Sequence, residues 1–187
     1  MKIYSKYFAA IFILAGWMAC MQPKKETSEN DSVKNTFKFL TEQFADLKII
    51  RYQIPGFNEL TPQQKELCYY LYQTALCGRD ITWDQNCKYN LVIRRTLEAI
   101  INSYNGDKNT DDFKKFMVYT KRVWFSNGIH HHYGSVKFMP EFSKEYFTTL
   151  INNADEKLLP LDGMSKDKFI DFLTPIIFDE KLFSKKV

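Results

Sequence analysis

The histidines of this chain lie in one short segment. Residues 124–133 read Trp-Phe-Ser-Asn-Gly-Ile-His-His-His-Tyr, and the chain has three histidines in total. Imidazole titrates near neutral pH and is the commonest metal ligand among side chains. Any histidine chemistry is therefore confined to His130, His131 and His132. If the segment is extended, alternation of side chains places His130 and His132 on one face and His131 on the other.

Two imidazoles on one face can begin a zinc site, but a catalytic zinc site usually takes three protein ligands and a water molecule. Because no obvious third ligand follows, we favour a hydrogen-bonded structural role or a place in a substrate cleft over a metal role. Ser126 near His130 suggests a nucleophile and its base, but an orienting carboxylate and a strained turn are missing. The simpler interpretation of Ser126, Asn127 and Gly128 is a turn that ends the preceding helix. Asn127 joins the three histidines as a candidate cleft or structural residue.

A second group of polar residues lies in a loop between two expected helices, a position that often carries binding residues. Asp80 and Asp84 are candidates for a pair of catalytic carboxylates. The alternative is that they cap helices and pair with Arg79, Arg94 or Arg95. We favour this structural use.

Capping residues and apolar spacing predict several helices. Thr61, Pro62 and Gln64 form a capping box at the start of one helix, which Gly78 ends. Its inward face is expected to comprise Leu67, Tyr70, Leu71, Thr74 and Ala75. Further helices are predicted over residues 89–104 and after the caps Thr110, Ser143 and Ser165, the last of them ending before Pro175.

The segment before these helices also has apolar residues at helical spacing. This spacing predicts an amphipathic helix with a face made of Val33, Phe37, Leu40, Phe44 and Leu47. A short extended segment over residues 49–54 follows and stops at a Pro-Gly turn. Strand patterns are few, so the expected fold class is mainly α, an α+β fold with few short strands.

The amino-terminal residues have the features of an export signal. Residues 1–19 begin with two lysines and continue with an apolar run that is too short to span a bilayer. Cys20 follows a small residue, which suggests a lipoprotein acylated at Cys20 after cleavage, with an ordinary cleaved signal as the alternative. Residues 20–32 form a polar tether, and residues 33–187 form a single mostly helical domain. We therefore expect an exported protein of the cell envelope, anchored to the membrane by lipid and facing the periplasm.

Charge and cysteine content limit the classes of partner. Loss of the two lysines in the export signal lowers the formal net charge from +4 to +2. Nucleic-acid binding would need a clustered basic face, so we expect no nucleic-acid partner. If Cys20 carries lipid, the remaining cysteines are Cys68, Cys77 and Cys87, an odd number. We expect buried free thiols, with a bond between Cys77 and Cys87 as the alternative.

Ordered motifs along nearly the whole chain point to a family. They are Phe44-Ala45-Asp46-Leu47, Arg51-Tyr52-Gln53-Ile54-Pro55-Gly56-Phe57, Gln64-Lys65-Glu66-Leu67, Gly78-Arg79-Asp80-Ile81, Asp84-Gln85-Asn86, Tyr89-Asn90-Leu91-Val92-Ile93-Arg94-Arg95, Lys121-Arg122-Val123-Trp124-Phe125, the histidine run and Ile177-Phe178-Asp179. With these motifs the chain resembles the amino-terminal portion of dipeptidyl peptidase III in its bacterial form. That family consists of zinc exopeptidases that release dipeptides from the amino end of oligopeptides.

The resemblance implies a two-lobed enzyme in which this portion faces a zinc-bearing lobe across the peptide cleft. The family's zinc motif, His-Glu-x-x-Gly-His, does not occur in this sequence, and family members are several times longer. We therefore expect a truncated or shortened peptidase portion that holds no catalytic zinc and is inactive alone, with zinc expected only in the full-length enzyme. Its expected partners are the missing lobe or an oligopeptide substrate. The alternatives are a non-catalytic peptide-binding or structural envelope lipoprotein and, more remotely, a zinc-scavenging protein that uses His130 to His132.

Overall fold

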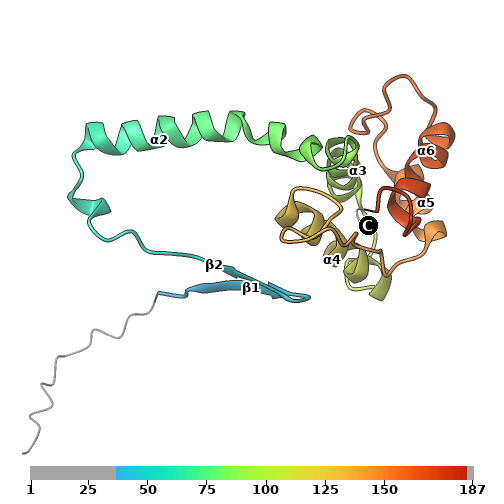
Figure 1. The fold of residues 1–187 in the computed structure, drawn as a ribbon, viewed down its shortest axis with the longest axis horizontal. Helices are drawn as coiled ribbons and strands as arrows, with labels where there is room; N and C mark the ends of the chain where they lie inside the picture. Colours follow the sequence, from blue (N-terminus) through green and yellow to red (C-terminus); the bar gives the residue numbers. More distant parts are fainter. Residues whose placement is uncertain (1–36, 185–187) are drawn as a thin grey trace, which may run out of the picture. The chain divides into compact units, whose positions relative to one another are not determined.

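The computed structural model describes residues 37–184. The chain divides into two units, Met1–Lys38 and Phe39–Val187, and the elements below belong to the second unit. The export signal, Cys20 and the tether lie outside the described residues. In chain order the elements are β1 (Leu40–Phe44), β2 (Leu47–Ile50), η1 (Phe57–Glu59), α2 (Pro62–Cys77), η2 (Arg79–Gln85), α3 (Asn90–Ser103), α4 (Asp111–Ser126), α5 (Lys144–Asn153) and α6 (Lys166–Phe178) (Figure 1).

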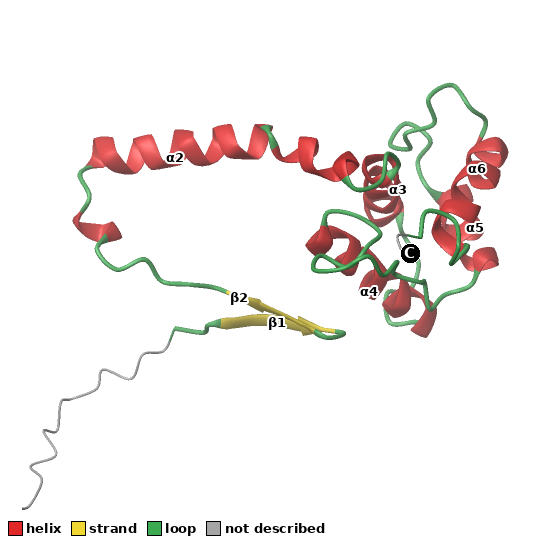
Figure 2. Cartoon of the chain, in the orientation of Figure 1, coloured by secondary structure: helices red, strands yellow, loops and turns green. Residues whose placement is uncertain are grey.

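Helices dominate this part of the chain, and the described residues contain one sheet, of two strands (Figure 2). The mainly α, α+β fold class expected from the sequence is therefore confirmed. Within the described residues, no helix is both long enough and apolar enough to cross a membrane.

The predicted amphipathic helix is wrong where the structure describes it, because residues 40–50 form an antiparallel hairpin. Phe44 pairs with Leu47 across the turn, and Ala45 has a φ of 47° there. The apolar spacing misled because positions i and i+4 share a face in a regular strand as well as in a helix. In this hairpin a register shift between Leu40 and Glu42 interrupts the alternation.

Helix α2 begins as the sequence predicts. The N–H of Gln64 donates to Thr61 Oγ1 at 3.2 Å, and the N–H of Thr61 donates to Gln64 Oε1 at 2.9 Å. Pro62 occupies the first helical position, where its missing N–H costs nothing, and Gly78 follows the last residue. The capping box and both ends of α2 are therefore confirmed.

The predicted inward face of α2 is wrong. Its five residues, Leu67, Tyr70, Leu71, Thr74 and Ala75, are all exposed, and no residue of α2 is buried. Large apolar side chains occupy the four consecutive positions 69–72, each with an exposed fraction between 57% and 60%. Because successive helical residues are about 100° apart, four in a row cover every side of the helix. A helix that is apolar all round normally lies inside a protein.

Helices α3 to α6 share one hydrophobic core. Fully buried side chains come from each of them: Ile93 and Leu97 from α3, Phe116 from α4, Phe147 from α5 and Phe169 from α6. Such residues exclude water from the interior and fix the four helices against one another. The polar segments described below are attached to the helices of this core.

The starts of the last three helices are confirmed. Thr110, Ser143 and Ser165 each accept a hydrogen bond from the backbone N–H three residues later. Helix α6 does not end before Pro175 as expected but continues through it to Phe178. The carbonyl of Pro175 still accepts a hydrogen bond, from the N–H of Asp179 at 3.0 Å, so the final turn closes in spite of the proline.

The three cysteines that the structure describes are free. Cys87 is buried as expected, whereas Cys68 and Cys77 on α2 are exposed. The expectation that all three are buried is wrong for Cys68 and Cys77, because no residue of α2 is buried.

Candidate functional site

The turn after α4 delivers the histidine segment to the core. Asn127 caps α4 in the left-handed conformation, with φ 51°, and its N–H donates to the carbonyl of Trp124. Gly128 follows with φ 153°, and its N–H donates to the carbonyl of Val123 at 3.0 Å. The predicted turn at Ser126, Asn127 and Gly128 is therefore confirmed.

Asn90, which starts α3, ties this turn to the rest of the core. Its side chain is fully buried, and its Nδ2 donates to the carbonyl of Trp83 at 2.8 Å and more weakly to that of Asn127 at 3.5 Å. Its Oδ1 accepts the N–H of Ile129 at 3.1 Å. A Cβ on Gly128 would lie 2.2 Å from Asn90 Nδ2, so only glycine fits there. This role of Asn90 is not predictable from the sequence, since a single asparagine at a helix start gives no long-range signal.

The three histidines do not alternate as expected. His130 is buried, with Nε2 2.7 Å from the carbonyl oxygen of Phe183. The rings of His131 and His132 stack on each other with centroids 4.4 Å apart. The chain turns directly after them, and the N–H of Tyr133 donates to His131 Nδ1 at 3.2 Å. The placement of His130 and His132 on one face is therefore wrong, because the segment turns instead of remaining extended.

A polar cavity of about 270 Å³ opens beside these rings, and we call it the histidine cavity. Its lining comprises Asn86, Asn90, Phe125, Ser126, Asn127, Gly128, His130, His131, His132 and Gly134. His132 Nδ1 and Ser126 Oγ are buried and have no hydrogen-bond partner among the described residues. Buried polar atoms are normally satisfied, so these two are exceptions beside the cavity. Because Ser126 Oγ has no hydrogen-bond partner among the described residues, it does not form a nucleophile and base pair with His130 here.

The predicted candidates Asn127, His130, His131 and His132 thus come together around one cavity. Among residues 37–184, no group of three or more His, Cys, Asp or Glu side chains is placed to hold a metal ion. The arrangement offers hydrogen-bond donors and acceptors to a polar ligand.

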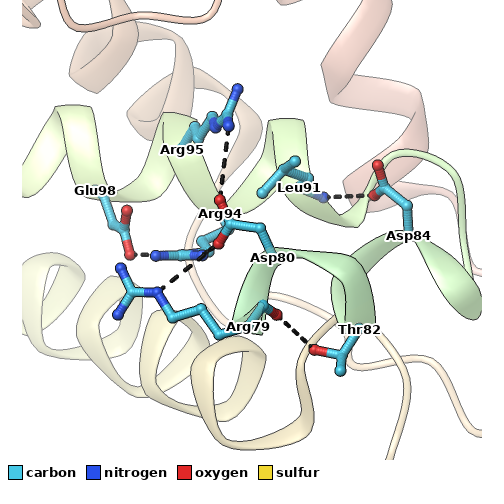
Figure 3. A network of polar contacts seen from close by, with 8 residues as sticks. All are labelled: Arg79, Asp80, Thr82, Asp84, Leu91, Arg94, Arg95 and Glu98. Atoms are coloured by element: carbon cyan, nitrogen blue, oxygen red, sulfur yellow. Dashed lines mark hydrogen bonds and ion pairs between the residues drawn. The ribbon is translucent and has the colours of Figure 1, made fainter. Parts of the chain in front are cut away.

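The second polar group centres on Asp80 in η2 (Figure 3). Its carboxylate accepts from Arg94 Nη1 at 2.5 Å and lies 3.8 Å from Arg79 Nε and 3.7 Å from Arg95 Nη2. Arg94 Nε also donates to Glu98 at 2.9 Å. The hydrogen bond from Arg94 holds the pKa of Asp80 below its usual value. Asp80 is therefore ionised and clamps η2 to α3.

Asp84 serves the same junction, because its Oδ1 accepts the N–H of Leu91 at 2.8 Å in the first turn of α3. Both carboxylates thus have the structural use that the sequence favoured. The clamp also fixes Trp83, whose indole ring lies 5.0 Å from the guanidinium of Arg94. Through the Trp83 carbonyl, it supports the position of Asn90.

Comparisons with known proteins add no relative. A scan against protein-family models found no match, and a search of curated proteins also found none. The function is therefore proposed from the residues of the chain.

Proposed function

We propose that this chain supplies peptide-binding surface to a zinc-dependent exopeptidase of the dipeptidyl peptidase III type and is inactive alone. The observation that carries the proposal is the histidine cavity, with His132 Nδ1 and Ser126 Oγ buried and unpartnered among the described residues. Peptides present an N–H and a C=O at almost every residue, which matches a cavity lined by donors and acceptors.

In such an enzyme, bound zinc polarises the scissile carbonyl and activates water. The resemblance implies a zinc site on another lobe, so this chain would bind and orient the peptide. Asn90 and Gly128 would hold the cavity wall in place. The apolar surface on all sides of α2 supports the proposal, because the further polypeptide of a two-lobed enzyme would cover it.

The second candidate is a non-catalytic peptide-binding lipoprotein of the envelope, anchored through Cys20. The closed core of α3 to α6 favours it, because this core supports the histidine cavity without any other lobe. Incubation of the full chain with zinc and a dipeptidyl naphthylamide separates enzyme from non-enzyme. Turnover above a metal-free blank would refute the statement that the chain is inactive alone.

Peptide binding itself is tested by nuclear magnetic resonance on the histidine rings, because the three imidazoles of the chain give few signals. Adding a pentapeptide with a free amino terminus should shift the signals of His131 and His132. If no such peptide shifts any ring signal at millimolar concentration, both peptide-binding proposals fail.

Two matched substitutions locate the contact. In His132→Asn the amide can occupy the position of Nδ1, whereas in His132→Gln it reaches the position of Nε2 instead. We expect peptide affinity to survive in His132→Asn and to fall by about fivefold in His132→Gln, the loss of one hydrogen bond of roughly 1 kcal/mol. Equal affinity in the two variants would show that His132 Nδ1 does not bind the peptide.

A further inference from the structure

A second cavity, of about 510 Å³, lies between η2, α3 and the end of α4. We call it the arginine cavity, and its lining comprises Arg79, Thr82, Trp83, Arg94, Glu98, Trp124 and Asn127. Asn127 also lines the histidine cavity, so the two cavities adjoin at that residue. Both cavities therefore contact the turn that ends α4.

The charges around the arginine cavity leave a cation available. The guanidinium groups of Arg79, Arg94 and Arg95 lie beside two carboxylates, those of Asp80 and Glu98, so one positive charge is in excess. Arg79 is 60% exposed and contacts Asp80 only through Nε, at 3.8 Å. Figure 3 shows the two terminal nitrogens of Arg79 on the side of the guanidinium that faces away from Asp80.

A second donor in the same cavity lacks an acceptor. The indole nitrogen of Trp124 is buried and has no hydrogen-bond partner among the described residues. Indole nitrogen donates and cannot accept, so only an oxygen or another acceptor from outside can satisfy it. Because this nitrogen is buried, the ring must move before an acceptor of a ligand can reach the N–H.

From these observations we infer that the arginine cavity binds a carboxylate of the peptide, with Arg79 as its ion-pair partner and the indole N–H of Trp124 as a second donor. Guanidinium groups bind carboxylates through two parallel hydrogen bonds, which favours a carboxylate over a neutral amide. The carboxylate comes from an acidic side chain or from the carboxyl terminus of the peptide. The inference rests on the proposed peptide binding and adds a preferred class of peptide to it.

The test uses the full chain and three sets of pentapeptides in calorimetric titrations. The first set carries one Glu, moved through each position of an Ala-Gly sequence, with an amidated carboxyl terminus. The second set carries Gln in place of Glu, and the third carries Gln with a free carboxyl terminus. We expect at least one carboxylate-bearing peptide to bind about tenfold more tightly than its neutral counterpart, which equals roughly 1.4 kcal/mol. The set that shows the gain identifies the source of the carboxylate.

Three variants assign the effect to the cavity. Arg79→Gln should remove the preference for the charged peptides, and Trp124→Phe should reduce it. Arg95→Gln is the matched control, because Arg95 also lies near Asp80 and is similarly exposed, at 56%, but does not line this cavity. It removes the same charge and should keep the preference.

Two results would overturn the inference while leaving peptide binding intact. One is equal affinity for charged and neutral peptides. The other is an equal loss in Arg79→Gln and Arg95→Gln, which would indicate a general electrostatic field. If none of the peptides binds, the carboxylate site and the proposed function both fail.

Discussion

Substitution of Gly128 by alanine is the most direct test of how the histidine cavity is built. The new Cβ would lie 2.2 Å from Asn90 Nδ2, so the buried amide must move. Its two shorter hydrogen bonds, to Trp83 and from Ile129, would then be lost. Each buried group left unpaired costs about 1–3 kcal/mol, and the backbone conformation adds about 1–3 kcal/mol of strain. We expect the free energy of unfolding to fall by at least about 3 kcal/mol, a large fraction of the stability of an ordinary domain.

Urea denaturation of the full chain measures this loss, and Gly163→Ala is the matched control. Gly163 has a φ of 79°, but no atom lies within 4 Å of a Cβ built there. In that variant only the strain of the left-handed backbone conformation should lower the free energy of unfolding, by about 1–2 kcal/mol. A double-mutant cycle then isolates the clash, because Gly128→Ala should cost less in an Asn90→Ala background. The explanation is refuted if Gly128→Ala costs no more than the control, or costs the same in both backgrounds.

The ion pair of Asp80 gives a pH-dependent prediction. Because its folded-state pKa is lowered, chiefly by the hydrogen bond from Arg94, the pair stabilises the protein above the ordinary carboxyl pKa, and this stability is lost as the pH falls through the lowered value. Asp80→Asn should cost about 1 kcal/mol at pH 7 in urea denaturation, and the difference should shrink below about pH 4. Leu71→Lys on the exposed α2 should change stability by less than about 0.5 kcal/mol, whereas Leu97→Ala in the core should cost about 2–5 kcal/mol. Lys137 donates to the carbonyls of Asp179 and Leu182. Lys137→Met should therefore speed hydrogen exchange at the amide of Leu182, and unchanged exchange would show that the lysine does not hold the segment.

The parts of the fold that the sequence predicted are those set by neighbouring residues. Thr61, Thr110, Ser143 and Ser165 each satisfy a backbone N–H three positions away, so the chemistry of each helix start is contained in the local sequence. The turn after α4 was predictable for the same reason, since Gly128 tolerates the required conformation.

The parts that the sequence did not predict depend on distant residues. Whether Leu40 and Phe44 belong to a strand or a helix depends on pairing with residues 47–50, because apolar residues four positions apart suit a regular strand as well as a helix. The burial of α2 depends on what packs against it, which periodicity cannot state. The role of Asn90 depends on a backbone segment 37–39 residues further along the chain.

The surroundings of Asn127 and of α2 bear on the choice between the two proposed functions. Asn127 lines both polar cavities, and its backbone is held by α4 on one side and by Asn90 on the other. A preorganised site of this kind suits peptide binding by either candidate. The exposed apolar residues of α2 do not suit both candidates equally. A lipoprotein working alone would have to keep four consecutive large side chains in water on every side of one helix. A peptidase in which further polypeptide packs around α2 accounts for both the rigid cavities and the exposed helix, and this is why we place it first.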